Sequence, residues 1–252
     1  SWGKQGNDNV LDPTASTNNI DVPEYYAYQD QYKPSYSNGN YSMVMYYKGN
    51  PDLTWETSYS FNTGIEFELF NHRLNGSFEY WSRKTDNLIY NKPVPVSSGI
   101  TTGSIPTNIG SVMNKGIEFN LDGTVIKTKD LSWALNFNIS HYKSKILALD
   151  PALEAQGGQK GSYYIRRVGG SMMEAYMKRW AGVDPETGEG LYYIDPDNGN
   201  WKTTSNYSDA KQSDLGDILP KIYGGFGTRL EFFGFDFSAM FSYQLGGKYY
   251  DG

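Results

Sequence analysis

Two carboxylates spaced two residues apart, Glu66 and Glu68, could in principle do acid–base chemistry. On an extended strand both side chains lie on one face, about 7 Å apart. That distance is close to the separation of the paired carboxylates in inverting glycosidases. The surrounding stretch alternates apolar and polar residues, however, which predicts that both are hydrated charges on the polar face of a strand. We therefore assign no catalytic residue.

Metal and cofactor chemistry finds equally little support. His72 lies in a predicted turn, and His141 lies roughly 40 Å along a predicted strand from that strand's own turn. The stretch DPDNGN (Asp195–Asn200) is similar to a calcium-binding loop, but Gly199 takes its fifth position and Asn206 its twelfth, where a Glu is needed. We expect a plain turn there, and no metal or cofactor.

The best candidate for ligand binding is the tyrosine-rich segment PEYYAYQDQYKPSYSNGNY (Pro23–Tyr41). Aromatic rings there could stack on sugar faces while neighbouring amides and carboxylates bind hydroxyl groups. Alternatively, the rings pack within a loop or contact a protein that covers it. The candidate residues are Tyr25, Tyr26, Tyr28, Tyr32 and Tyr36.

Composition excludes several classes of protein. The 252 residues are 38% hydrophobic and 16% aromatic, and no apolar run approaches the ~20 residues of a membrane helix. A membrane β-barrel stays open, since its strands are only half apolar. The formal net charge is −6 and no basic block is present, which argues against nucleic acid. The sequence begins with what looks like the end of a strand and stops without an obvious final element. We therefore expect the chain to be a piece of a longer one.

Three hairpins of alternating residues are predicted to position these side chains. They are Thr57–Leu69 with Leu74–Thr85, Gly116–Ile126 with Leu131–Lys143, and Phe226–Phe232 with Phe235–Leu245.

The alternation can be tested by register, because directly opposed residues of an antiparallel pair share a face. A two-residue loop at Asn71-His72 opposes Phe67 to Gly76, and Phe233-Gly234 opposes Leu230 to Phe237. A three-residue loop in the second hairpin opposes Gly123 to Trp133. Apolar residues then meet apolar residues in all three hairpins, and rings cover the glycines.

The links between strands are unequal in length. Links within hairpins are very short, whereas Asp86–Lys115 and Ser144–Gly225 are long and polar. That asymmetry is typical of outer-membrane barrels, which have long extracellular loops and short periplasmic turns. We expect the segment between Ser144 and Gly225 to cross the membrane either not at all or twice. Aromatic residues near strand ends suit an interfacial girdle: Tyr59, Phe70, Tyr80, Trp81, Tyr142, Phe232, Phe233 and Tyr243.

The apolar face would then meet lipid and the polar face a hydrated lumen. On this reading Phe67, Leu121, Leu135 and Phe237 face lipid, and the tight turns are periplasmic. The alternative is a secreted β-sandwich, in which the apolar face meets a second sheet. The many charges on the polar face favour the barrel.

Several motifs resemble the SusC/RagA family of TonB-dependent outer-membrane transporters. They occur in the family's order over nearly the whole chain: SWGKQGNDN, NPDLTWET, NGSFEYWSRKTDNLIY, NIGSVMNKGIEFNL, GVDPETGEGLYY and GDILPKIYGGFGTRLEFFGFDFSAMFSYQLGGKYYDG.

The resemblance implies an all-β fold, an antiparallel transmembrane segment of a 22-stranded plugged barrel with long extracellular loops. It implies that residues 1–252 are one partial barrel domain without the plug or the final strands. It further implies import of an oligomeric nutrient, a glycan or a peptide, with TonB and a SusD-like surface lipoprotein as partners. A soluble surface binding protein or adhesin, or a glycan-cleaving enzyme on a β scaffold, are the alternatives.

Overall fold

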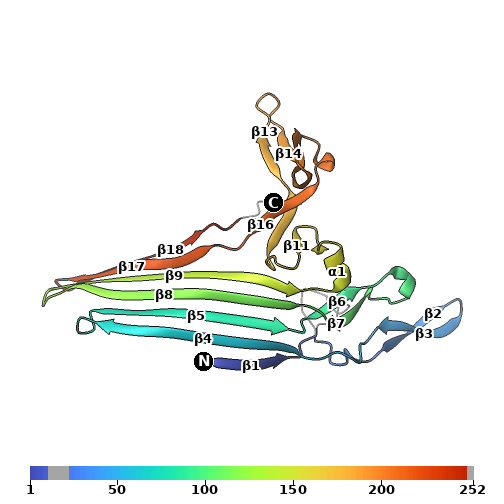
Figure 1. Ribbon diagram of the computed structural model, residues 1–252, viewed down its shortest axis with the longest axis horizontal. Coiled ribbons are helices and arrows are strands. Elements are labelled where there is room, and N and C mark those ends of the chain that lie inside the picture. The colour runs from blue at the N-terminus through green and yellow to red at the C-terminus, as the bar shows by residue number, and fades with distance from the viewer. Residues whose placement is uncertain (11–22, 249–252) are drawn as a thin grey trace. The chain divides into compact units, whose positions relative to one another are not determined.

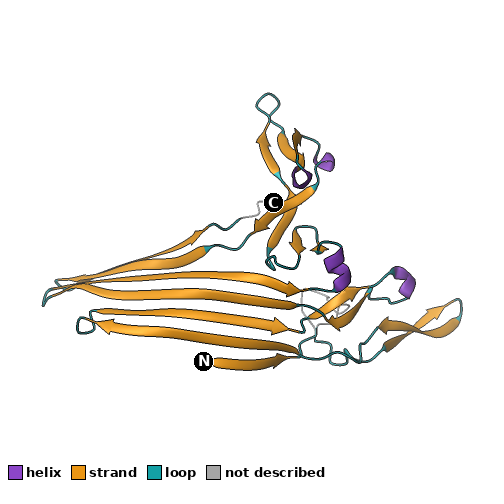
Figure 2. Cartoon of the chain, in the orientation of Figure 1, coloured by secondary structure: helices purple, strands orange, loops and turns teal. Residues whose placement is uncertain are grey.

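The computed structural model describes residues 1–10 and 23–248 and is built almost wholly of β-strands (Figures 1 and 2). Strands β1 (Trp2–Asn7), β4 (Glu56–Leu69), β5 (Leu74–Asp86), β8 (Ser111–Lys127), β9 (Leu131–Ala148), β17 (Ile222–Phe232) and β18 (Phe235–Leu245) form one sheet in that order. We call it the long sheet. No helix among the described residues is long and apolar enough to cross a membrane.

The chain divides into two compact units. Unit 1 comprises Ser1, Phe61–Ser82 and Met113–Gly252, and unit 2 comprises Trp2–Ser60 and Arg83–Val112. Strands β4, β5 and β8 contribute residues to both. The expectation of a single partial barrel domain stays a prediction.

In unit 1 the hairpins form nearly as the alternation predicts. Strand β17 pairs with β18 so that Phe232 opposes Phe235 and Leu230 opposes Phe237, as expected. The connecting residues Phe233 and Gly234 have positive φ angles of 46° and 86°, as in the type I′ turns that suit twisted two-stranded hairpins.

The first hairpin also turns where predicted. Asn71 and His72 both have positive φ angles, and the amide of Arg73 donates to the carbonyl of Phe70. The ring of Phe67 lies so close to Gly76 that a Cβ there would approach it to 2.4 Å. Phe67 therefore covers the backbone of Gly76, as the register predicts.

The second hairpin corrects one prediction. Its loop is Thr128–Asp130, closed by a hydrogen bond from the Thr128 amide to the Leu131 carbonyl. Trp133 does not cover Gly123: Leu74 of β5 lies against that glycine instead. The Trp133 indole donates to the Thr228 hydroxyl of β17 at 2.9 Å, because a large ring on a central strand can also reach its other neighbour.

The segment between β9 and β17, residues 149–221, forms small sheets of its own, and we call it the β9–β17 insert. Strand β9 pairs directly with β17, for example Phe137 with Phe226, so no strand of the insert enters the long sheet. Of the two expected numbers of membrane crossings within this segment, zero or two, the structure therefore gives zero. One sheet contains β10 (Gln159–Lys160), β11 (Tyr164–Arg166), β12 (Glu174–Lys178) and β16 (Gln212–Asp217); the other contains β13 (Trp180–Val183), β14 (Gly190–Asp195) and β15 (Asn200–Thr204).

Short helices complete the insert. They are α1 (Pro151–Ala155) and two 3₁₀ turns, Pro196–Asn198 and Tyr207–Asp209. The side chain of Asp150 caps α1 by accepting from the Ala152 amide at 2.8 Å, which satisfies a donor that the helix leaves free.

Unit 2 holds two further hairpins and one 3₁₀ turn at Val96–Ser98. The hairpins are β2 (Gln31–Ser37) with β3 (Asn40–Tyr47) and β6 (Ile89–Pro93) with β7 (Ser104–Asn108). The buried side chains of unit 2 are few and include Val10, Ala27 and Tyr47.

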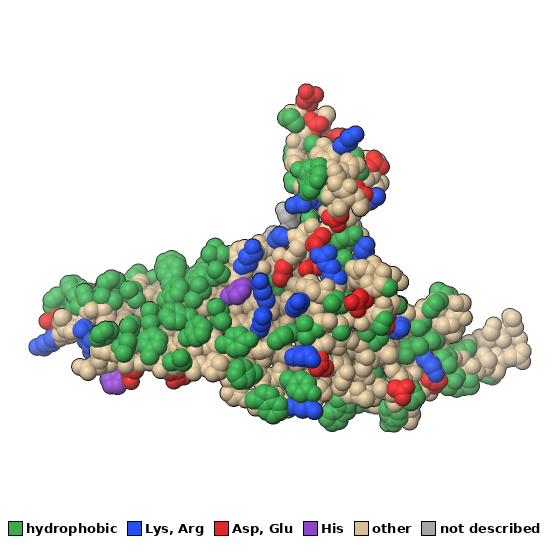
Figure 3. Space-filling model, in the orientation of Figure 1, with side chains coloured by type: hydrophobic (Ala, Val, Ile, Leu, Met, Phe, Trp, Pro, Cys, Tyr) green, Lys and Arg blue, Asp and Glu red, His purple; other side chains and the backbone are tan. Residues whose placement is uncertain are grey.

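The apolar face of the long sheet in unit 1 is exposed. Ile65 is 69% exposed, Phe237 59% and Leu245 58%, and Figure 3 shows hydrophobic side chains gathered over β8, β9, β17 and β18. A sandwich would cover these side chains with a second sheet, and a contiguous patch of this kind marks a surface that meets something apolar.

Candidate functional site

The polar face of the long sheet in unit 1 carries separate groups of side chains joined by hydrogen bonds and ion pairs. Arg229 donates to Asp236 at 2.8 Å and lies 3.0 Å from Glu231. Asn120 donates to the Ser77 hydroxyl at 3.1 Å. Such cross-strand pairs hold the strands in register and leave this face suited to water. They agree with the prediction that the polar face meets water.

A row of aromatic side chains crosses the same polar face. Trp81 of β5, Tyr142 of β9 and Tyr223 of β17 follow one another, with ring centroids 6.3 Å and 6.2 Å apart. Gly116 of β8 lies beneath the indole, since a Cβ there would approach the Trp81 ring to 2.8 Å. We call Trp81, Tyr142 and Tyr223 the aromatic row.

The aromatic row corrects part of the predicted girdle. The Trp81 indole donates to the Glu118 carboxylate at 2.9 Å, which places the ring on the polar face. Tyr142 contacts both Trp81 and Tyr223. Neither side chain can then belong to a girdle on the apolar face. Alternation already put Trp81 on the polar side, and its position near a strand end was misleading.

The five predicted tyrosines are all exposed in unit 2, but they do not form one cluster. Tyr25, Tyr26 and Tyr28 lie in a turn, whereas Tyr32 and Tyr36 lie on β2, where the Tyr36 ring packs 4.8 Å from Tyr41. Tyr25 and Tyr28 line a cleft of about 400 Å³ together with Trp55 and Glu24. Trp55 was missed because a single tryptophan before a strand has no distinctive spacing.

A second aromatic cluster lies in the β9–β17 insert. The rings of Trp180 and Tyr192 meet edge to face with centroids 5.4 Å apart, and those of Tyr192 and Tyr207 with centroids 5.0 Å apart. The Lys178 ammonium lies 3.8 Å from the centroid of Tyr207. These rings come from β13, β14 and the 3₁₀ turn Tyr207–Asp209, so no local period could have grouped them.

Ion pairs anchor this insert. Arg167 pairs with Glu174 at 3.0 Å and also with Asp214, and the hydrogen bond from Arg167 to Asp214 raises the pKa of the guanidinium. Lys211 pairs with Asp195 at 2.6 Å, and this hydrogen bond lowers the pKa of the Asp195 carboxyl.

The Asp195–Asn200 stretch is a turn, as predicted. Asn198 donates to the Asp195 carboxylate at 2.9 Å, and Gly199 has a positive φ of 79°. Strands β14 and β15 pair on either side of it. The Asp195 oxygens are thus occupied by Lys211 and Asn198.

A family model for the TonB-dependent receptor-like β-barrel matches residues 11–251. The chain belongs to this family.

Curated relatives agree with the assignment. TonB-dependent receptor P3 of Formosa agariphila is 30% identical over 79% of the chain, which covers 21% of the relative. TonB-dependent receptor SusC of Bacteroides thetaiotaomicron is 27% identical over 99% of the chain, which covers 25% of that protein. The chain thus spans about a quarter of the length of these relatives.

A solved structure gives the same answer for the fold. The RagAB peptide importer in its closed-closed state superposes with a TM-score of 0.75 at 27% identity, over 98% of this chain and 26% of that one. The predicted antiparallel β-barrel segment of the SusC/RagA family is confirmed. TonB-dependent receptors of this family are outer-membrane proteins, as expected from the sequence.

In a TonB-dependent receptor the exposed apolar face of the long sheet meets lipid, and the polar face with the aromatic row lines the barrel interior. The carboxylate of Glu68 contacts His72 at the tight turn. His141 contacts the Lys221 carbonyl and lies ten residues beyond Leu131, the first residue of β9. The structure thus keeps the two histidines apart, and Glu68 pairs with a turn residue.

Proposed function

We propose that the receptor containing this chain actively imports an oligomeric nutrient, a glycan or a peptide, across the outer membrane. Support comes from the family, since one relative is SusC and one similar structure is that of a peptide importer. The observation that carries the proposal is the polar barrel face crossed by the aromatic row.

This face suits a hydrated polymer better than a small ion. Rings such as Trp81 and Tyr142 stack on sugar rings or peptide planes, and each good ring contact contributes about 0.5–1.5 kcal/mol. The neighbouring Glu118 and Asn120 offer acceptors and donors to hydroxyl or amide groups. A chain-like ligand can engage such a row stepwise, because the three rings lie about 6 Å apart.

Exposed aromatic side chains outside the long sheet fit the capture step. We assign capture to the predicted tyrosines, with Tyr25 and Tyr28 in their cleft, and contact with a SusD-like surface lipoprotein to the insert around Trp180 and Trp201. A ligand held by many such contacts needs external work for inward release, which TonB would supply.

Uptake of labelled oligosaccharides and peptides by cells tests the proposal. Deleting TonB should abolish uptake but leave surface binding largely intact, and deleting the neighbouring lipoprotein gene should weaken capture. Full-rate uptake without TonB would overturn active import in favour of a passive pore.

A further inference from the structure

A groove lies on the apolar face of the long sheet in unit 1. It encloses about 350 Å³ between strands, with walls formed chiefly by Phe78, Ile117, Phe119, Ile139 and Ile222. His141 and Lys221 border it, and they contact one another through the His141 ring and the Lys221 carbonyl. Walls of this kind suit an acyl chain, and the border beyond Ile139 and Ile222 is polar.

Two more lysines continue this polar border. Lys115 lies two residues before Ile117 on β8, and Lys143 lies two residues after His141 on β9, so alternation puts both on the apolar face. Strands β8 and β9 are neighbours in the sheet, and the His141 carbonyl lies against Gly116. Lys115, Lys143 and Lys221 are exposed, and none pairs with a carboxylate of the described residues. We call Lys115, His141, Lys143 and Lys221 the basic border.

The height of the basic border matches a membrane interface. Leu131, at the tight-turn end of β9, and His141 are about 34 Å apart along the strand at about 3.4 Å per residue. With a strand tilt of about 40°, that is about 26 Å along the membrane normal, close to the ~25 Å apolar band of outer-membrane barrels. Figure 3 shows basic side chains where the hydrophobic patch ends.

Lys115 and Lys143 are unpaired cations on neighbouring strands of one face, and they would repel one another without an anion between them. The lysine stems can lie along the apolar surface while their ammonium groups reach the headgroup level. Phosphate is a fitting partner, because charge-assisted hydrogen bonds to it are short and strong.

We propose that the groove and its basic border bind a phosphate-bearing lipid of the outer leaflet, with an acyl chain in the groove and phosphate between Lys115 and Lys143. The outer leaflet is chosen because the border lies at the end away from the tight turns, and barrels carry their short turns on the periplasmic side. This inference stands apart from the proposed import activity, because it concerns the opposite face of the sheet.

Native mass spectrometry of the intact receptor with added bisphosphorylated lipid A tests the site. The double variant Lys115→Gln, Lys143→Gln should retain at least tenfold less lipid A than the unaltered receptor. The matched control is Lys127→Gln with Lys129→Gln, at the tight-turn end of β8, and it should retain lipid A normally. Equal retention by the double variant and the control would overturn the proposal.

A measurement on the unaltered receptor avoids any effect of substitution on folding. Lipid A without its phosphates should be retained at least tenfold less than the bisphosphorylated form, and excess inorganic phosphate should not displace the latter. Equal retention of both forms would contradict the assigned phosphate contact. Phosphatidylglycerol that competes on equal terms with lipid A would contradict the choice of an outer-leaflet lipid.

Discussion

The long sheet of unit 1 and the β9–β17 insert belong to one unit but keep their apolar side chains in opposite ways. The long sheet exposes Ile65, Phe237 and Leu245 along one face. The insert buries Ile165, Ala175 and the fully enclosed Ser213, and it pairs its charges. Along a short stretch of chain, the packing of side chains thus changes from one suited to lipid to one suited to water.

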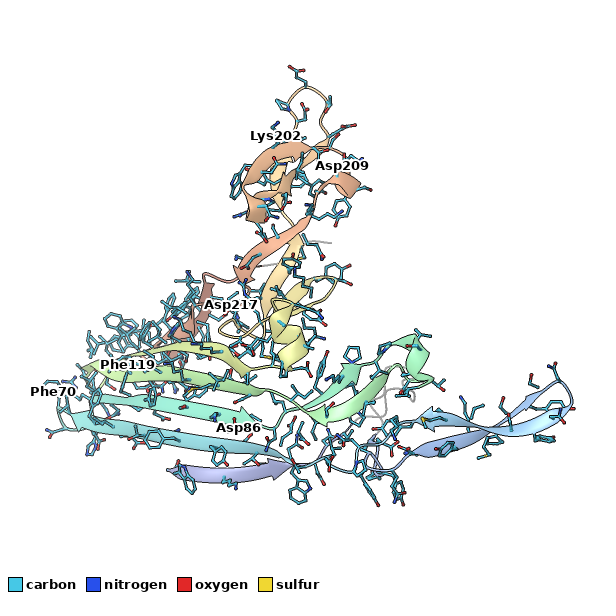
Figure 4. All side chains as sticks on the ribbon, turned by 45° about the vertical axis from the view of Figure 1, so that its right-hand side comes forward. Phe70, Asp86, Phe119, Lys202, Asp209 and Asp217 are labelled. Carbon is cyan, nitrogen blue, oxygen red and sulfur yellow. The ribbon has the colours of Figure 1, made fainter. Side chains whose placement is uncertain are left out.

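The difference explains why the two regions use different residues. In lipid, every backbone donor must be paired within the sheet, and long strands such as β8 and β9 do this. In water, short strands suffice when side-chain contacts hold them together. In the insert these contacts are the ion pairs of Arg167 and Asp195 and the edge-to-face packing of Trp180 on Tyr192. Figure 4 labels Phe119 in the first region and Lys202 and Asp209 in the second.

The largest loss of stability is expected from a charge placed on the lipid face. Leu135→Arg should destabilise the inserted receptor by about 2–4 kcal/mol, because Leu135 lies near the middle of the apolar band. Asn136→Arg, one residue along on the polar face, should fold nearly normally. Urea titration of folding into lipid vesicles measures both, and equal losses would contradict the assignment of faces.

Removing the charge that anchors the insert should have a smaller and local effect. Arg167→Met leaves the mostly buried Glu174 carboxylate and Asp214 without their partner. Because Arg167 is itself partly exposed, we expect a loss of about 1–2 kcal/mol, confined to β11, β12 and β16. Hydrogen exchange of the intact receptor measures it, with Lys202→Met as the exposed control. Faster exchange across β17 and β18 would show that the two regions unfold together.

The aromatic row should affect ligand rather than stability. Trp81→Ala should weaken binding of the imported oligomer by roughly fivefold, since one ring contact contributes about 1 kcal/mol. Tyr80→Ala is the matched control, because Tyr80 lies on the other face of β5, where its ring contacts Phe61 of β4. Isothermal calorimetry with the intact receptor compares them. Equal affinities of both variants would remove Trp81 from the ligand path.

The smallest effect concerns pH and only the insert. The folded state lowers the pKa of Asp195 through Lys211, so the stabilisation is complete above the ordinary pKa of about 3.9 and is lost as pH falls through the lowered value. Lys211→Met should therefore open the β14–β15 hairpin at pH 7 and make no difference at strongly acidic pH. Hydrogen exchange at the two pH values measures this, and a difference that persists in acid would contradict it.

The sequence predicted the long sheet well because one physical rule governs it. A strand between lipid and water must alternate, so the pairing of Leu230 with Phe237 could be derived from residue order and turn length alone. The rule fails where a side chain has a choice of two neighbouring strands, as with Trp133 and Thr228. Position near a strand end also does not tell whether an aromatic residue belongs to an interfacial girdle or to the polar face, as Trp81 shows.

The insert and the candidate site were less predictable. The turn at Asp195–Asn200 was predicted from its residues, but the packing of Trp180 on Tyr192 and of Tyr192 on Tyr207 joins segments that local patterns do not connect. The basic border was missed for a similar reason. Lys115, Lys143 and Lys221 are far apart in sequence and meet only through strand pairing.

Spin labels at alternate positions of β9 and β18 test the two-faced barrel wall most directly. With the intact receptor in lipid bilayers, labels at Leu135 and Phe237 should be relaxed by oxygen, which dissolves in lipid. Labels at Asn136 and Ser238 should be relaxed by a water-soluble nickel complex. Access of the nickel complex to all four positions alike would contradict the account.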